Sequence, residues 1–147
     1  MDFSLNEEQL MLTDSVSRFI DNDYDFETRQ KIAESGKGYS TDLWQTYAEL
    51  GWTAITFAEE DGGLGGGAIE LMVMMEQFGR GLVVEPFLAT VILAGGVLKN
   101  AASTAQKEKW LVGIIEGQIQ AALAFSEPQS RFDIADIATN ARIDGAK

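Results

Sequence analysis

Helix signals recur along residues 1–117, and they constrain the fold more than any other feature of the sequence. Capping residues, apolar residues three or four positions apart and glycines at helix ends together predict five helices. The predicted helices span about residues 4–21, 41–50, 68–78, 86–98 and 104–116. A succession of amphipathic helices with no strand between them is typical of an all-α helical bundle.

Polar capping residues mark where several of these helices begin. Ser4–Glu7 is a Ser-x-x-Glu capping box for the first helix, and Ser103–Gln106 is a second box for the fifth. Ser40 caps the second helix, and Pro86 suits the first turn of the fourth. The helix starts are therefore defined by local chemistry.

Each predicted helix also has an apolar face that we expect to be buried. The third helix is apolar nearly all round, because Met72, Val73, Met74 and Met75 are consecutive, so we expect it at the centre of the bundle. These methionines are expected to fill the core rather than a ligand groove. The other expected core residues are Leu5, Leu12, Val16, Phe19 and Ile20, then Leu43, Trp44, Tyr47 and Leu50, and finally Trp110, Leu111, Ile114 and Ile115.

The helical pattern ends at Gly117, and a different pattern follows. Residues 119–125 form a short apolar run that predicts a strand, and residues 137–143 predict a second. We therefore expect a helical domain over residues 1–117 and the first strands of a truncated β domain over residues 118–147. Two strands do not bury a face by themselves, so this part is expected to dock on a partner or to belong to a longer domain.

Composition excludes several classes of site. The sequence has no His and no Cys, so it supplies no disulfide, no thiolate zinc site and no Ser-His or Cys-His pair. The net charge is −12, of which residues 1–75 carry −11, so nucleic acid is an unfavourable partner. The longest apolar run, residues 86–98, is too short to cross a bilayer, and the N-terminus is acidic. We expect a soluble cytoplasmic protein that does not bind membranes.

Two segments are predicted to be loops and invite a functional interpretation. The polar segment around Gly36 and Gly38 is one, and residues 61–67, with five glycines, are the other. Residues 63–68 match the dinucleotide fingerprint G-x-G-x-x-A, and Glu85 follows at a suitable distance. The fingerprint requires a strand before the glycines, whereas acidic residues precede them here, so a Rossmann site is not favoured.

Residues 21–25 alternate Asp with other residues, as a calcium loop does. The sixth position is Phe26 instead of Gly, and the twelfth is Ile32 instead of Glu, so both the tight turn and the bidentate ligand are missing. A polar linker is the preferred interpretation, and no metal ligands are assigned.

Five motifs in order carry a resemblance to a known family. They are Leu50-Gly51-Trp52, Ala58-Glu59-Glu60-Asp61-Gly62-Gly63-Leu64-Gly65, Met75-Glu76-Gln77-Phe78-Gly79-Arg80, Gln106-Lys107-Glu108-Lys109-Trp110-Leu111, and Ala122-Leu123-Ala124-Phe125-Ser126-Glu127-Pro128. Together they resemble the N-terminal helical domain of flavin-dependent acyl-CoA dehydrogenases and the beginning of their middle β domain. The resemblance covers the whole chain.

The resemblance implies FAD as cofactor and oxidation of an acyl-CoA to the 2,3-enoyl-CoA, a step of fatty-acid β-oxidation in lipid metabolism. In the family the strand ending in Thr/Ser-Glu-Pro lies along the flavin, which implies cofactor contacts for Leu123, Phe125 and Ser126. The family then has Gly-Ala-Gly-Ser-Asp, where this chain has Gln-Ser-Arg-Phe-Asp. Arg131 is expected to replace the lost phosphate contact.

Residues 127–133 are also similar to the small subunits of two-chain acyl-CoA dehydrogenases, the pimeloyl-CoA type among them. A homo-oligomer, or a hetero-oligomer with another such subunit, is therefore expected. The family's acyl chain enters beside the helix predicted over residues 86–98, which implies substrate contacts for Phe87, Ala89, Thr90 and Leu93. Plain helix packing is an equally good interpretation of these four residues.

No catalytic residue is assigned, because the resemblance puts the base in a C-terminal helical domain that residues 1–147 do not reach. Glu127 is expected to be structural, and the 147 residues alone are expected to be inactive. The alternative is a non-catalytic helical subunit or interaction module of a heteromeric complex.

Overall fold

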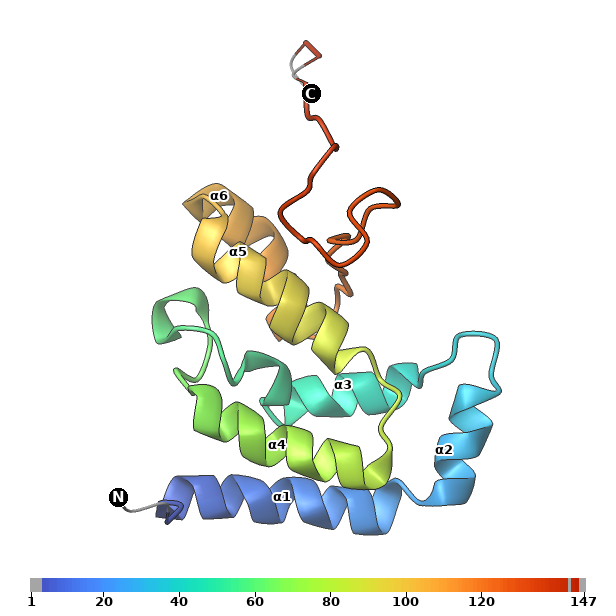
Figure 1. Cartoon of the computed structure of the whole chain (residues 1–147). Helices are drawn as coiled ribbons and strands as arrows, with labels where there is room; N and C mark the ends of the chain where they lie inside the picture. Colours follow the sequence, from blue (N-terminus) through green and yellow to red (C-terminus); the bar gives the residue numbers. More distant parts are fainter. Residues whose placement is uncertain (1–3, 143, 146–147) are drawn as a thin grey trace.

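A computed structural model describes residues 4–142 and 144–145, and it confirms the helical prediction for the first part of the chain. In Figure 1, α1 and α4 lie side by side, α3 lies next to α4, and α5 and α6 lie beyond them. The elements are α1 (Glu7–Asp23), α2 (Phe26–Ala33), α3 (Thr41–Glu49), the 3-10 turns η1 (Trp52–Ala54) and η2 (Glu59–Asp61), α4 (Ala68–Gly81), the π-helical η3 (Leu88–Ala94), α5 (Gly95–Ala101), α6 (Thr104–Gln106), the π-helical η4 (Lys107–Leu111) and α7 (Val112–Ile115).

The start of α1 differs from the predicted capping box. The N-cap is Asn6, whose side chain accepts from the Gln9 N–H at 2.8 Å while the Gln9 side chain accepts from the Asn6 N–H at 3.0 Å. Asn and Ser cap helices about equally well, so local chemistry does not separate this box from Ser4–Glu7. A tertiary contact favours the later start, because Gln9 Nε2 donates to Glu70 on α4 at 2.8 Å. The Ser103–Gln106 box is confirmed.

The polar segment before Gly36 was predicted to be a loop, and this was wrong for residues 26–33, which form α2. Asp25 is its N-cap and accepts from the Thr28 N–H at 2.7 Å. The acidic residues that resembled a calcium loop serve other roles, since Asp21 pairs with Arg80 at 2.6 Å. The helix has no buried residue and little apolar periodicity, which is why the pattern missed it.

Aromatic rings from several elements meet in one core. The Tyr47 ring stacks on Phe78 with centroids 5.3 Å apart, and Phe19 contacts Trp52 edge-on at 5.3 Å. Phe78 in turn contacts Phe87 edge-on at 5.2 Å. Aromatic pairs in such geometries add to the stability that burial gives, so this cluster holds α1, α3 and α4 against the helix that begins near Phe87.

Three residues predicted to be buried are exposed instead. Met72 is 55% exposed, Leu50 47% and Trp110 42%. Val73 and Met74 are buried as expected, so one side of α4 faces the core. The opposite side is exposed, and α4 is therefore not surrounded by other helices as its apolar sequence predicted. Apolar composition therefore overestimated burial where a helix has neighbours on one side only.

The predicted strands are not formed in the described part of residues 118–147; Ile143, in the second of them, lies outside the described residues. Residues 119–127 form neither helix nor strand and include a tight turn in which the Phe125 N–H donates to the Leu123 carbonyl at 3.1 Å, and residues 128–132 form turns. Figure 1 shows this tail leaving the helical body and projecting from it. A strand needs a neighbour for its N–H and C=O groups, and neither segment has one here.

Gly79, inside α4, has open space where a side chain would begin. We expect Gly79→Ala to stabilise the protein by about 0.5–1 kcal/mol, because alanine loses less backbone freedom in a helix. Urea unfolding at neutral pH measures this change. Gly81→Ala is the matched control in the same helix, since its Cβ would lie 2.9 Å from Ile20, and destabilisation is expected. Equal effects from both variants would contradict this view of the helix.

Candidate functional site

The predicted cofactor segment is attached to the predicted substrate helix by one hydroxyl. Thr90 Oγ1 donates to the Ala121 carbonyl at 3.0 Å and accepts from the Ala121 N–H at 3.3 Å. The Ile119 N–H also donates to the Gly113 carbonyl at 2.9 Å, and a Cβ at Gly113 would lie only 2.4 Å from the Ile119 side chain. The start of the extended segment is thus held between two helices, and the two sets of predicted residues lie in the same region.

The four predicted substrate residues differ in burial. Phe87 and Thr90 are each only 1% exposed, whereas Ala89 and Leu93 are half-buried. The contact of Phe87 with Phe78 and the hydrogen bonds of Thr90 with Ala121 give both residues a packing role. Ala89 and Leu93 are the members of the set whose side chains are partly accessible.

A surface hollow of about 300 Å³ lies next to this attachment point. Of the predicted site residues only Leu123 lines it, and the other lining residues were not predicted from the sequence. A usable signal was present, because Ala94, Val97 and Leu98 follow Thr90 at the spacing of one helix face. The lining residues are Ala94, Val97, Leu98, Trp110, Ala121, Ala122 and Leu123.

The predicted cofactor residues are all accessible. Leu123 is 37% exposed and Phe125 56%, and Ser126 and Arg131 are exposed as well. Among the described residues, the N–H groups of Leu123, Ala124 and Ser126 and the Ser126 hydroxyl donate no hydrogen bond. Free N–H and O–H donors suit the polar edge of a flat heteroaromatic ring, so the donors present here fit a flavin.

Glu127 organises the chain that follows. Its carboxylate accepts from the Ala138 N–H at 2.8 Å, the Thr139 N–H at 3.2 Å and the Thr139 hydroxyl at 2.6 Å, and also from the Gln129 amide. Ser130 Oγ donates to the Glu127 carbonyl at 2.9 Å and accepts from the Glu127 N–H. Residues 127–139 therefore form a loop closed by the groups of its two ends.

Arg131 lies in this loop with a φ of 50°. The left-handed region is unfavourable for residues other than glycine, and the family pattern Gly-Ala-Gly-Ser-Asp has glycine at this position. The Arg131 side chain is exposed and makes no ion pair within the described residues. The backbone at Arg131 thus has a conformation that glycine adopts more easily, and the guanidinium is free to contact an anion.

Acidification is expected to open this loop only at low pH. The Thr139 hydroxyl, the Gln129 amide and the Ala138 N–H lower the pKa of Glu127 from 4.5 to about 2. Because the folded pKa is the lower one, the carboxylate stabilises the loop fully above pH 4.5 and loses this effect as the pH falls through about 2. Hydrogen exchange by NMR, relative to intrinsic rates, should show the Ala138 and Thr139 amides still protected near pH 5. Protection already lost there would contradict the assigned hydrogen bonds.

The glycine-rich segment has a structural role. The Gly63, Gly65 and Gly66 N–H groups donate to main-chain carbonyls at 2.9, 2.8 and 2.7 Å. These donors are therefore not available to cradle a phosphate. Glu85, which stood where the fingerprint expects a ribose-binding acid, is 5% exposed and accepts from the Tyr24 hydroxyl at 2.7 Å.

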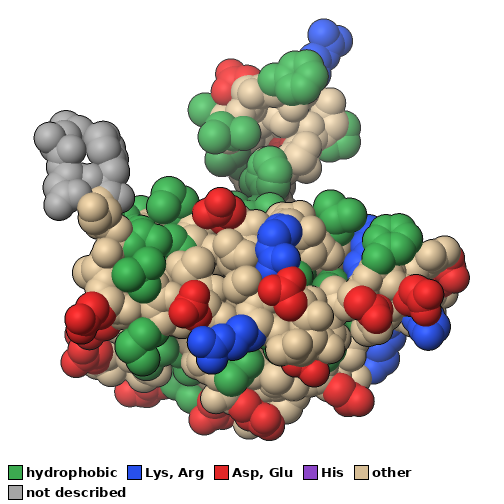
Figure 2. All heavy atoms as spheres, turned by 90° about the horizontal axis from the view of Figure 1, so that it is seen from below, with side chains coloured by type: hydrophobic (Ala, Val, Ile, Leu, Met, Phe, Trp, Pro, Cys, Tyr) green, Lys and Arg blue, Asp and Glu red, His purple; other side chains and the backbone are tan. Residues whose placement is uncertain are grey.

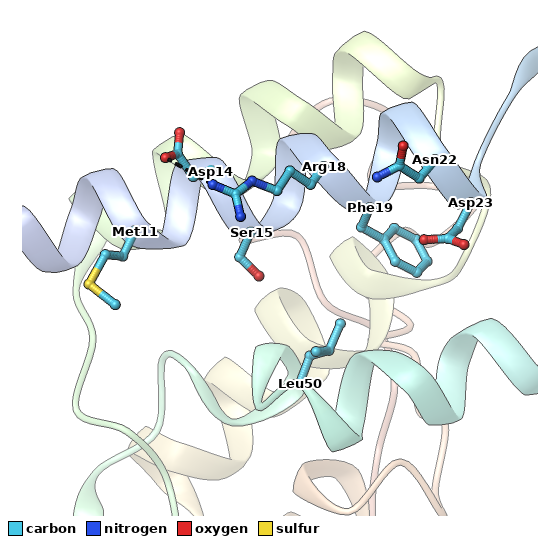
Figure 3. A pocket seen from close by; sticks show the side chains of 8 residues that line it. All are labelled: Met11, Asp14, Ser15, Arg18, Phe19, Asn22, Asp23 and Leu50. Atoms are coloured by element: carbon cyan, nitrogen blue, oxygen red, sulfur yellow. Dashed lines mark ion pairs between the residues drawn. The ribbon is translucent and has the colours of Figure 1, made fainter.

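A second hollow, of about 460 Å³, lies along α1 and reaches Leu50 (Figure 3). Asp14 and Arg18 form a long, exposed ion pair at 3.8 Å within it. Acidic side chains are spread over the face in Figure 2 with basic ones among them, as in a solvated surface. In the described ranges, no group of three or more Asp or Glu residues is arranged for a metal ion, and no helix is long and apolar enough to span a bilayer.

The chain is similar to known proteins over most of its length. The family described as acyl-CoA dehydrogenase, N-terminal domain, matches residues 6–118. The acyl-CoA dehydrogenase FadE12 of Mycobacterium tuberculosis is 29% identical over 145 residues, which cover 98% of this chain and 37% of that protein. The chain thus spans little more than a third of the length of this curated relative.

Solved structures that are similar in fold and above 25% in identity include the following two. The Tcur3481-Tcur3483 steroid ACAD has a TM-score of 0.78 and 26% identity, over 99% of this chain and 38% of that one. The FAD complex of PigA has a TM-score of 0.74 and 29% identity, over 87% of this chain and 34% of that one.

Proposed function

Because the chain belongs to the acyl-CoA dehydrogenase family through its N-terminal domain, we propose that it forms part of a flavin-dependent enzyme that oxidises an acyl-CoA thioester to the 2,3-enoyl-CoA. The observation that carries the proposal is the attachment of the extended segment to the substrate helix through Thr90 and Ala121. This contact supports the proposal because it joins the two segments that are proposed to bind cofactor and substrate, directly after the family match ends.

In this proposal Leu123 and Phe125 lie along the flavin, and Ser126 donates its hydroxyl and N–H to the polar edge of the ring. Bound FAD supplies the acceptor for the hydride that leaves the acyl chain. Arg131 binds a phosphate group as a bidentate donor, in place of the small residues of the family pattern. The free donors of the extended segment and the exposed guanidinium support these roles.

The acyl chain is proposed to lie against the helix that starts near Phe87. Ala89 and Leu93 contact it with their accessible surfaces, while the buried Phe87 and Thr90 form the support behind them. Ala89 is small and leaves room for a wide acyl group. The hydrogen bonds of Thr90 keep the cofactor segment at a fixed distance from this helix.

We propose no catalytic base among these residues and expect no acyl-CoA oxidation by the 147 residues alone. A second acyl-CoA dehydrogenase subunit is the proposed partner, and the two-part name of the Tcur3481-Tcur3483 steroid ACAD supports a hetero-oligomer. Oxidation of acyl-CoA by the isolated chain with added FAD would contradict this expectation.

The test is the visible absorption spectrum of the native protein, alone and with its partner. Bound oxidised flavin gives a yellow protein, and Ser126→Ala is expected to weaken flavin binding. Ser15→Ala, an exposed serine on α1, is the control and should retain the flavin. A colourless native protein that takes up no added FAD would contradict the proposal.

The alternative is a non-catalytic helical subunit that docks on a partner. The apolar hollow beside Trp110 and Leu123, with both side chains partly exposed, is the observation that favours it. A colourless protein that still forms a stable complex with another subunit would support this alternative.

A further inference from the structure

The loop of residues 127–139 is closed by a single carboxylate. Four donors from three residues converge on Glu127, and two of those residues, Ala138 and Thr139, lie 11 and 12 positions further along the chain. A charged acceptor with several donors gives stronger hydrogen bonds than a neutral one. Among the described residues no lysine or arginine pairs with Glu127, so the closure depends on hydrogen bonds alone.

The closed loop also fixes its own turn. Ser130 is only 6% exposed, and its hydroxyl both donates to and accepts from the backbone of Glu127. The next residue, Arg131, has a φ of 50° and an exposed side chain. A non-glycine residue stays in this region only where the surrounding structure holds it.

We propose that Glu127 is a positioning residue: its carboxylate closes residues 127–139 into a loop that presents the Arg131 guanidinium to a phosphate group. The identity of the ligand rests on the proposed function, in which FAD and coenzyme A both carry such phosphates. Glu127 itself does not contact the ligand. It acts by holding the turn in which Arg131 lies.

The closure is tested first without ligand. In Glu127→Gln the amide Nε2 takes the place of one acceptor, so the Gln side chain does not hold all four donors. We expect tryptic cleavage after Arg131 and exchange of the Ala138 and Thr139 amides to become about tenfold faster. Asp136→Asn is the control, because it makes the same charge change in the same loop and no described donor contacts the Asp136 carboxylate. Its cleavage and exchange rates should stay within about twofold of those of the unchanged protein.

Thr139→Val keeps the backbone donor and removes only the hydroxyl, so an intermediate rate is expected. This variant tests the closure even if Glu127→Gln folds poorly. Equal cleavage and exchange rates in all four proteins would overturn the proposal.

The ligand is tested on the native oligomer freed of flavin, by titration with FAD, riboflavin and coenzyme A in separate arms. Riboflavin carries no phosphate. Glu127→Gln and Arg131→Gly are each expected to weaken the binding of FAD or coenzyme A by about tenfold and to leave the affinity for riboflavin unchanged. The affected arm identifies the source of the phosphate.

Glycine relieves the strained φ, so Arg131→Gly should keep the Ala138 and Thr139 amides protected while it loses phosphate affinity. Faster loop opening with unchanged FAD and coenzyme A affinities would overturn the positioning role and leave the proposed function intact. Failure of the unchanged protein to bind either ligand would contradict the proposed function and overturn the phosphate role of Arg131 as well.

Discussion

Gly63→Ala is expected to destabilise the protein by about 3 kcal/mol, at the upper end of what overpacking costs. A Cβ at this position would lie 2.1 Å from the Phe57 carbonyl oxygen and 2.3 Å from the Phe57 carbonyl carbon. Backbone atoms do not rotate out of the way as a side chain does, so the whole turn must move. That movement would also weaken the hydrogen bond from the Gly63 N–H to the Ala58 carbonyl, which is 2.9 Å long.

Urea unfolding followed by tryptophan fluorescence measures this loss. Gly36→Ala is the matched control, because nothing lies within 4 Å of a Cβ there. It is expected to change the free energy of unfolding by less than about 1 kcal/mol, and to raise it if the backbone conformation at residue 36 suits alanine. A Gly63→Ala protein as stable as the control would show that the glycine-rich segment does not require close backbone packing.

Glu85→Ala is the second variant for which a loss of about 3 kcal/mol is expected. Glu85 accepts from the Tyr24 hydroxyl at 2.7 Å and from the Ser40 N–H at 3.2 Å, and it is 5% exposed. Its removal leaves both donors without this acceptor, and each buried unpaired group costs about 1–3 kcal/mol. Burial and the neighbouring Glu85 both raise the pKa of Tyr24, so the tyrosine stays a neutral donor.

Two controls separate this loss from simple removal of a charge. Glu49→Ala, at an exposed position of α3, is expected to change the free energy of unfolding by less than about 0.5 kcal/mol. Glu85→Gln keeps one oxygen acceptor, so its loss in the free energy of unfolding should lie between those of Glu85→Ala and Glu49→Ala. If Glu85→Ala unfolds at the same urea concentration as Glu49→Ala, the carboxylate does not join the end of α1 to the segment that leads into η3.

Part of the candidate site was accessible from the sequence because it depends on local order. The segment ending in Ser126, Glu127 and Pro128 was recognisable as a motif, and residues 122–126 within it are exposed. The hydrogen bonds from residues 138 and 139 to Glu127 were not predictable from the sequence. They join residues 11 and 12 positions apart in an irregular segment, and no short-range sequence pattern specifies such a contact. The positive φ of Arg131 was hidden for the same reason, because the turn is set by the closed loop.

Two of the failures in the helical region have a common physical cause. The two capping boxes at the N-terminus are nearly equal in energy, and only the contact between Gln9 and Glu70 separates them. Trp110 and Met72 have apolar side chains at helical spacing, but burial depends on which neighbours a helix has. Propensity and periodicity describe one helix at a time and do not specify these neighbours.

Apart from α2 and the 3-10 turns, the sequence alone determined which segments up to residue 115 are helical, with their ends placed to within about three residues, and which family motifs the chain carries, because caps, stop glycines and periodicity act within a few residues. Tertiary structure decided the rest. It attached Ala121 to Thr90, used the backbone of the glycine-rich segment for packing, and left residues 119–127 without a neighbouring strand. These outcomes depend on groups far apart in the chain that meet only after the helices have packed, and no short-range pattern encodes such meetings.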